Sequence, residues 1–451
     1  MQKNSSSYLV RSLKITNFLQ PNLVRGLFAD KIVRNTAYSL LEMLLPFILM
    51  LVATPFLLLR MGTENYGLWN VALAFIGLLG IFDLGMGTAV TKFIAEYLEK
   101  RDVQNISSTA TTAIVLNALV GLVFTVILYW FSPWLSQLFS STEVPTIKIE
   151  IVFRLAALGL FPMLFENICL AIPKGFQDYK TPTLILTFQN ATTLLLAMII
   201  TLVNGSIIHV VTGTVIIIWF FTILSLMLAY QRLRQLEAKI VFSSNALHEL
   251  LGYMLFMGLT GIGIKIFTLF DRVVVAQVLG FSAAAYYIIA TGIANKFPAF
   301  ASAATQALLP AFSSWSVNHE KRLIWKKLFK ATLIMGVVVL VPGTIFLLIS
   351  RPLLIAWLGT QAGETVLYPM RILVFIYMVK TVTAPSFQAA NGLGFPWITT
   401  IAVTVASLGT ISLIVLLGKS QGLVGASWAN IASWSLFIII FYLRKFLTKD
   451  S

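Results

Sequence analysis

Eight charged side chains fall inside long apolar stretches of this 451-residue sequence, and their chemistry stands out from the rest. They are the acids Glu42, Asp83 and Glu166, the lysines Lys265, Lys296 and Lys380, and the arginines Arg154 and Arg371. An ionised group in hydrocarbon costs a few kcal/mol or more, so it faces water, a ligand or a partner of opposite charge. These residues are therefore the candidates for a binding or coupling site.

The three lysines all lie in the second half of the chain, where the apolar stretches contain no acid. Cations in this setting can bind phosphate groups, because charge-assisted hydrogen bonds offset the lost hydration. Lys265 follows a glycine-rich stretch, Gly258–Gly263, at which a helix can bend. The structural alternative is that each lysine pairs with one of the three acids and only fixes the packing.

The three acids are candidates for carrying coupling protons, because a buried carboxyl group can retain its proton near neutral pH. Asp83 has a competing structural role beside Gly85 and Gly87 at a helix end. Arg154 and Arg371 lie near the ends of their stretches, so their side chains can reach the membrane interface instead of a ligand.

The elements that must position these residues are membrane-spanning helices. Hydrophobic residues make up 58% of the chain and charged residues only 11%, whereas soluble domains carry about 25% charged residues. A helix needs ~20 apolar residues to cross a bilayer. Apolar stretches of about this length fall at roughly 36–59, 67–90, 110–131, 151–173, 183–203, 207–229, 250–270, 284–308, 330–350, 367–389, 397–417 and 423–443. We predict an all-α integral membrane protein with about twelve transmembrane helices.

The basic residues predict the orientation of these helices. Of the 32 Lys and Arg, 22 fall in the termini and the loops on one side, and five fall in the loops on the other. Loops rich in Lys and Arg stay in the cytoplasm, so both termini are predicted to be cytoplasmic. Residues 1–35 are predicted to be a basic segment, either an amphipathic helix on anionic lipid or a partly ordered tail. The net charge of +15 follows from this pattern and does not indicate nucleic acid as a partner.

Landmarks recur at an offset of about 218 residues, which indicates an internal duplication. Gly62 corresponds to Gly280, Pro133 to Pro352, Arg154 to Arg371 and Gly175 to Gly392. We predict two six-helix lobes, residues 36–240 and 241–451, related as parallel repeats around a central cavity. Two such lobes can rock against each other to expose the cavity to either side of the membrane.

The sequence offers no site for a metal, a nucleotide or a cofactor. Gly418-Lys-Ser420 lacks the first glycine of a phosphate-binding loop, and His248-Glu249 lacks the second histidine of a zinc site. Cys169 is the only cysteine, so the chain forms no internal disulfide. The loops are too short for a catalytic domain, and we do not expect an enzyme.

Three segments resemble polysaccharide-export flippases. Met61–Trp69, Phe82–Gly87 and Thr91–Glu96 resemble the region around their second helix, Gly175–Pro182 their loop between helices four and five, and Ala307–Ser313 the end of their eighth helix. The family is the O-antigen and teichoic-acid exporter branch of the multidrug/oligosaccharidyl-lipid/polysaccharide exporter superfamily. The resemblance covers residues 36–443, and its motifs are loose.

The resemblance implies a V-shaped pair of lobes in a prokaryotic cytoplasmic membrane. It also implies a polyprenyl-diphosphate-linked oligosaccharide as the substrate, moved from the inner to the outer leaflet during surface polysaccharide biosynthesis. Helices one, two, seven and eight line the cavity in that family, which favours Lys265 and Lys296 as headgroup contacts over Lys380. Membrane lipids are the other expected partners, together with a polysaccharide polymerase and glycosyltransferases.

Two other functions compete with the lipid-linked oligosaccharide flippase. A cation-coupled small-molecule exporter of the same superfamily would need a smaller cavity with acidic binding residues. A membrane glycosyl polymerase or ligase would need a long outer loop with catalytic residues, and the sequence contains no such loop.

Overall fold

The computed structural model describes residues 45–80, 85–139, 144–203, 206–236, 241–265, 269–305, 308, 312–313, 315 and 321–448, without the side chains of 255–265. All regular elements in these ranges are helices. The predicted basic segment 1–35, Glu42, Asp83 and most of the Ala307–Ser313 motif lie outside the described residues.

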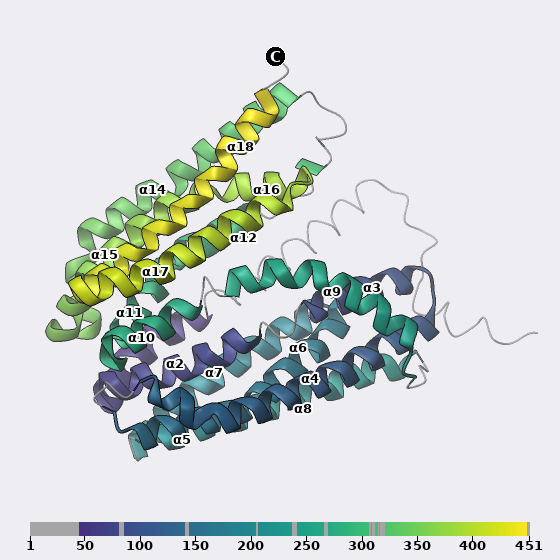
Figure 1. The fold of residues 1–451 in the computed structure, drawn as a ribbon, viewed down its shortest axis with the longest axis horizontal. Coiled ribbons are helices and arrows are strands. Elements are labelled where there is room, and N and C mark those ends of the chain that lie inside the picture. Colours follow the sequence, from purple (N-terminus) through teal and green to yellow (C-terminus); the bar gives the residue numbers. More distant parts are fainter. Residues whose placement is uncertain are drawn as a thin grey trace, which may run out of the picture.

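The helices form two groups that follow the two halves of the chain, except that the start of the helix Ser244–Lys265 lies beside the helix Met86–Glu99 of the first group (Figure 1). The first group contains the helix Leu45–Met61, α2 (Thr63–Leu79), α3 (Met86–Glu99), α4 (Val103–Gln137), α5 (Thr146–Leu158), α6 (Leu160–Gly175), α7 (Lys180–Val203) and α8 (Ile207–Arg234). The second contains α9 (Ser244–Lys265), α10 (Asp271–Leu279), α11 (Phe281–Ala294), α12 (Lys296–Thr305), α14 (Lys321–Leu358), α15 (Thr360–Thr381), α16 (Ala384–Gly392), α17 (Pro396–Trp428), η3 (Ala429–Leu436) and α18 (Phe437–Thr448).

Seven helical segments among the described residues are long and apolar enough to cross a membrane. The last of them, Pro396–Thr448, has 53 residues and bends at Gly422, where φ is 62°, so it is long enough to cross twice. Large apolar side chains also point outward, for example Trp130, Leu348 and Phe441, which are 76%, 75% and 66% exposed. The all-α membrane fold is thus confirmed, and the count of twelve spans stays a prediction.

The backbone repeats its conformation at the duplicated landmarks. Gly62 and Gly280 each precede a helix, α2 and α11, with φ of 79° and 88°. These left-handed values favour glycine, which has no Cβ to clash. Pro133 and Pro352 lie inside the corresponding long helices α4 and α14. Shared local geometry at these positions supports the proposed duplication.

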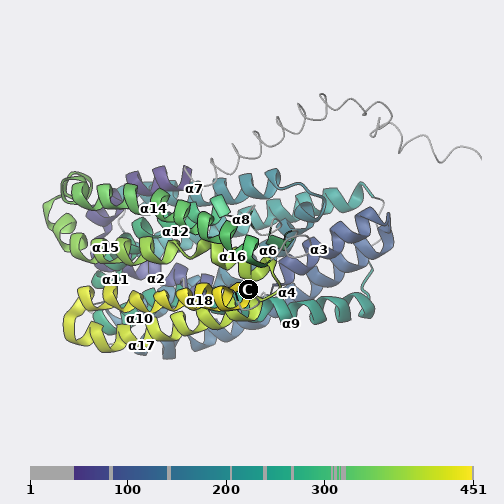
Figure 2. The same ribbon diagram turned by 90° about the horizontal axis from the view of Figure 1, so that it is seen from above.

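The two groups meet at one end of the molecule and diverge toward the other, where the C-terminus lies (Figure 1). We call these the closed end and the open end. Seen from above, the second group lies over the closed-end part of the first group, and α3 with the start of α9 extends beyond it (Figure 2). The basic ends of α8, α14 and α18 lie at the open end, which favours a cytoplasmic location for it.

The closed end is held by α2 against α11. The Thr63 and Ser282 hydroxyls lie 3.0 Å apart across the two groups. A Cβ atom at Gly67 would lie 1.9 Å from the carbonyl oxygen of Phe281, so the two backbones touch at a place where only glycine fits. Phe281 also stacks on Phe139, with ring centroids 5.3 Å apart.

Two helices cross between the groups. The start of α9 packs on the first group, where the Ser243 amide donates to Thr112 Oγ1 at 3.1 Å and Tyr97 donates to Glu249 Oε2 at 2.6 Å. Leu250 belongs to a hydrophobic core made with α3, α4, α6 and α8. Conversely, Trp357 of the second group donates to the Leu51 carbonyl of the helix Leu45–Met61 at 2.5 Å.

The Gly175–Pro182 motif forms a tight turn that is tied to α8. Asp178 accepts hydrogen bonds from the Thr181 amide at 3.1 Å and the Thr181 hydroxyl at 2.8 Å, and it pairs with Arg232 at 2.6 Å. Burial alone would raise the pKa of Asp178, but these hydrogen bonds and the guanidinium hold the pKa below its usual value. The carboxylate thus caps the start of α7 while it anchors the turn.

We expect Asp178→Ala to lower the free energy of unfolding by about 1–2 kcal/mol, because it removes a helix cap and an ion pair. Since the folded pKa is lowered, this contribution is full above pH ~4 and is lost as the pH falls through the folded pKa. The measurement is thermal unfolding of the purified protein in detergent. Asp178→Asn, which keeps the cap without the charge, should give an intermediate loss. Equal stability of all three proteins would contradict this role.

Candidate functional site

Lys296 lies where the two groups of helices face each other. It is the first residue of α12, it is partly buried, and its Nζ lies 4.8 Å above the ring of Phe47 in the helix Leu45–Met61. Among the described residues, no carboxylate lies within ion-pair distance of this ammonium group. The cation–π contact holds the lysine at the junction of the groups and leaves the ammonium group able to bind an anion.

The structure describes the other predicted members of this site only in part. Lys265 is the last residue of α9, and its side chain is not among those described. Glu42 and Asp83, the acids nearest to this region in the predicted topology, also lie outside the described residues. Their roles, and any pairing with Lys296, stay predictions.

Lys380 belongs to a buried polar network inside the second group. Its Nζ lies 3.9 Å above the ring of Tyr377, and its charge interacts with that of Asp271. Tyr287 donates to Asp271 Oδ2 at 3.0 Å, and Asn430 donates to the Tyr287 oxygen at 2.8 Å. Tyr377 donates in turn to Asn430 Oδ1 at 3.1 Å. The network therefore joins α10, α11, α15 and η3.

An acid that lies outside the predicted spans of the second half is buried inside the second group. Asp271 is only 4% exposed and lies near Lys380, in a helix, α10, that continues to Leu279 beyond the predicted end of the seventh span at residue 270. The duplication carried the missing signal, because an offset of 218 places Asp271 opposite Ala53, inside the first predicted span. Lys380 thus has a buried acid close by, which favours the structural alternative for this lysine.

Glu166 forms a second buried polar cluster, inside the first group. It is 3% exposed and accepts hydrogen bonds from Gln189 Nε2 at 3.0 Å and from Ser225 Oγ at 3.3 Å. No ion pair to Glu166 is present among the described residues. Its partners come from α7 and α8, so the carboxyl group faces the interior of the first group and not the second group.

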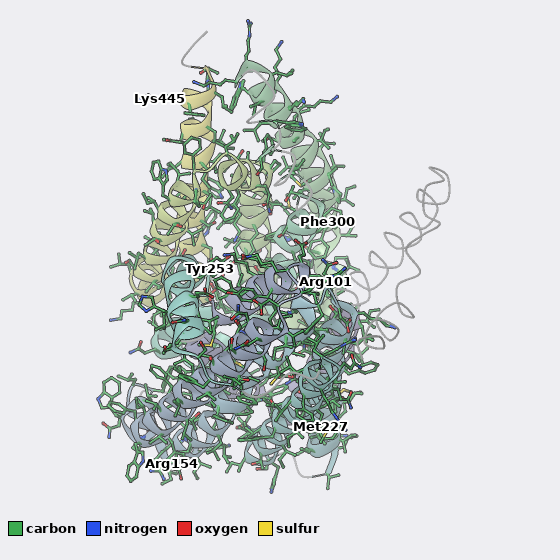
Figure 3. The ribbon with its side chains drawn as sticks, turned by 90° about the vertical axis from the view of Figure 1, so that its right-hand side faces the viewer. Arg101, Arg154, Met227, Tyr253, Phe300 and Lys445 are labelled. Atoms are coloured by element: carbon green, nitrogen blue, oxygen red, sulfur yellow. The ribbon has the colours of Figure 1, made fainter. Side chains whose placement is uncertain are left out.

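The two arginines lie apart from Lys296. Arg154 pairs with Glu150 at 2.8 Å on its own helix and lies at the edge of the first group farthest from the second (Figure 3). Arg371 donates from Nε to Ser350 Oγ at 2.9 Å, between α15 and α14. Arg154 is thus held by an acid of its own helix, and Arg371 joins two helices of one group, while the interfacial role of either stays a prediction. Lys296 is therefore the one described candidate that lies between the groups.

The described residues contain no cluster of His, Cys, Asp or Glu that could hold a metal ion. Among the candidates whose side chains the structure describes, one cation, Lys296, lies between two groups of helices that touch at one end and separate at the other (Figure 1). Such a site can bind an anionic group and can change its exposure if the groups move.

The chain is similar in sequence to proteins of polysaccharide biosynthesis and O-antigen transport. The sequence model of the family described as "Polysaccharide biosynthesis protein" matches residues 32–316. The "Putative O-antigen transporter" of Shigella flexneri is 22% identical over 413 residues, which cover 91% of this chain and 95% of that protein.

Solved structures share the fold. An inward-facing multidrug resistance MATE family transporter of the MOP superfamily superposes with a TM-score of 0.74 at 16% identity, covering 92% of this chain and 99% of that one. The lipid II flippase MurJ, in an inward closed conformation, superposes with a TM-score of 0.72 at 15% identity, covering 91% of this chain and 87% of that one.

Proposed function

This chain belongs to the polysaccharide biosynthesis protein family, and we propose that it flips a polyprenyl-diphosphate-linked oligosaccharide from the inner to the outer leaflet of a prokaryotic cytoplasmic membrane. It is a multi-pass membrane protein, and the similar proteins reported above are named as transporters or flippases. The lipid-linked substrate is the class that the names of the O-antigen transporter and the lipid II flippase indicate.

The observation that carries this proposal is Lys296 between the two groups of helices. A diphosphate cannot enter hydrocarbon unless its charge is met, and an ammonium group at membrane depth can meet it. Lys265 is the second proposed contact. The lobes that we propose to move around this site are residues 36–240 and 241–451, with the start of α9 held on the first lobe by its contacts there.

We propose that the open end faces the cytoplasm, so that the structure is inward-facing and can receive the substrate from the inner leaflet. Separation of α2 from α11 at the closed end would then open the site to the opposite side of the membrane. Glu166 stays a candidate for the coupling proton, together with Glu42 and Asp83. A buried carboxyl group without a cation partner is suited to gain and lose a proton.

We expect a disulfide across the closed end to stop transport. In a Cys169→Ala background, Thr63→Cys with Ser282→Cys should cross-link on oxidation, because the two native hydroxyls are 3.0 Å apart. Export in cells should fall at least tenfold and return when the disulfide is reduced. Each single-cysteine variant is the control and should keep its activity under both conditions. Full export by the cross-linked protein would contradict the opening of α2 from α11.

The direct test of function uses the purified protein in proteoliposomes without ATP. A fluorescent polyprenyl-diphosphate oligosaccharide should become accessible to a quencher on the far side at a rate well above that of protein-free vesicles. A strict requirement for ATP, or transport restricted to small organic cations, would refute the flippase and would favour the small-molecule exporter.

A further inference from the structure

A groove of about 460 Å³ runs between α14, α16 and α18, separate from the site at Lys296. Its walls are mostly apolar and include Phe329 of α14 and Phe441 of α18, and Arg444 lines one end. This volume lies within the 300–1,000 Å³ that is usual for ligand sites. The three helices contact one another pairwise, so the groove is a fixed feature of the second group.

The end of the groove at the open end of the molecule is cationic. Arg444 lines it from α18, and Arg322 of α14 is three residues before the lining residue Trp325, a spacing that places the two side chains near each other on a helix. Both arginines are exposed, and no carboxylate pairs with either of them within the described part of the chain. Basic pockets between helices at a cytoplasmic surface bind anionic lipid headgroups.

The groove lies away from the path proposed for the substrate. α14 and α18 form the edge of the second group that faces away from the first (Figure 1), and Lys445, next to Arg444, marks the tip of α18 on that side (Figure 3). Lys296 lies on the face of the second group that is turned toward the first group, and the groove lies on the opposite face. A lipid headgroup bound at Lys296 would therefore not lie in the groove. The occupant of the groove is therefore a separate molecule.

We propose that this groove binds one anionic phospholipid of the inner leaflet. Its phosphate is held by Arg444 with Arg322, and one acyl chain lies against Phe329 and Phe441. The proposal rests on the cytoplasmic assignment of the open end, but not on the substrate named above.

The test is native mass spectrometry of the protein purified from nanodiscs that contain equal amounts of dioleoyl phosphatidylglycerol and dioleoyl phosphatidylcholine. One phosphatidylglycerol should stay bound. Arg444→Ala should reduce its retention about tenfold or more, because it removes a charge-assisted contact. Lys445→Ala, which removes the same charge one residue along, should change retention less than twofold.

A second pair of variants tests the groove itself. Thr332→Trp places a large ring in the groove and should abolish retention, while Ile334→Trp, on the lipid-facing side of the same helix, should not. Equal retention of the two lipids, or equal retention by wild type and Arg444→Ala, would overturn the proposal. So would displacement of the lipid by inorganic phosphate, which would show a headgroup-only site. Displacement by a polyprenyl diphosphate would assign the groove to the substrate and would also overturn it.

Discussion

Replacement of Lys296 by alanine should reduce export about 10- to 100-fold while the protein still inserts and accumulates normally. The expectation follows from the place of this lysine between the two groups of helices, where its only described partner is the ring of Phe47. Removing one charge-assisted contact to a diphosphate costs ~1.5–3 kcal/mol. The measurement is the rate of flipping in proteoliposomes, normalised to the amount of folded protein.

Two controls separate substrate binding from packing. Lys296→Arg keeps the charge and should retain much of the activity, and Lys419→Ala removes a lysine far from the site and should have no effect. If Lys296 instead pairs with Asp83, the alanine variant should express poorly, and removing that acid as well should restore expression. Normal export by Lys296→Ala at normal abundance would contradict both interpretations.

Asp271→Ala should destabilise the protein by about 3 kcal/mol, because it leaves buried polar partners without their acceptor. Tyr287 would lose its bond to Oδ2, and the charge of Lys380 would lose its nearby acid. The measurement is thermal unfolding followed by size-exclusion chromatography in detergent. The expected result is a lower melting temperature and a smaller folded fraction.

The controls for Asp271 test whether the network acts as a unit. Asp271→Asn keeps an acceptor for Tyr287 and should cost less than alanine. The double variant Asp271→Ala with Lys380→Met removes both buried charges and should recover part of the lost stability. If the three proteins unfold at the same temperature as wild type, the network has no structural role, and Asp271 and Lys380 become candidates for transport.

Much of the fold could be predicted from the sequence, because hydrocarbon constrains it so strongly. The apolar stretches predict helices, and glycines such as Gly62 and Gly280 have the same left-handed conformation at the equivalent helix starts. The candidate at Lys296 also follows from local information, since a lysine far from both ends of a span cannot reach the interface.

The buried networks could not be predicted in the same way. The seventh predicted span ends at residue 270, whereas Asp271 is only 4% exposed and accepts a hydrogen bond from Tyr287, which in turn accepts one from Asn430. These contacts join residues up to 143 positions apart, and hydropathy does not record which helices are neighbours. The packing of α9 on the first group was missed for the same reason, because a division at residue 240 assigns the whole helix to the second lobe.

The two crossing helices, Leu45–Met61 and α9, also decide the order in which the protein can assemble. Helices enter the membrane from the N-terminus as the ribosome proceeds. The core of the first group includes Leu250 and Met254, so it stays incomplete until α9 has been inserted. The hydrogen bond from Trp357 to the Leu51 carbonyl forms later still, because Trp357 follows 306 residues further along the chain. Biogenesis therefore cannot finish one half before it begins the other, and two halves expressed as separate polypeptides would have to exchange both helices before either core is closed.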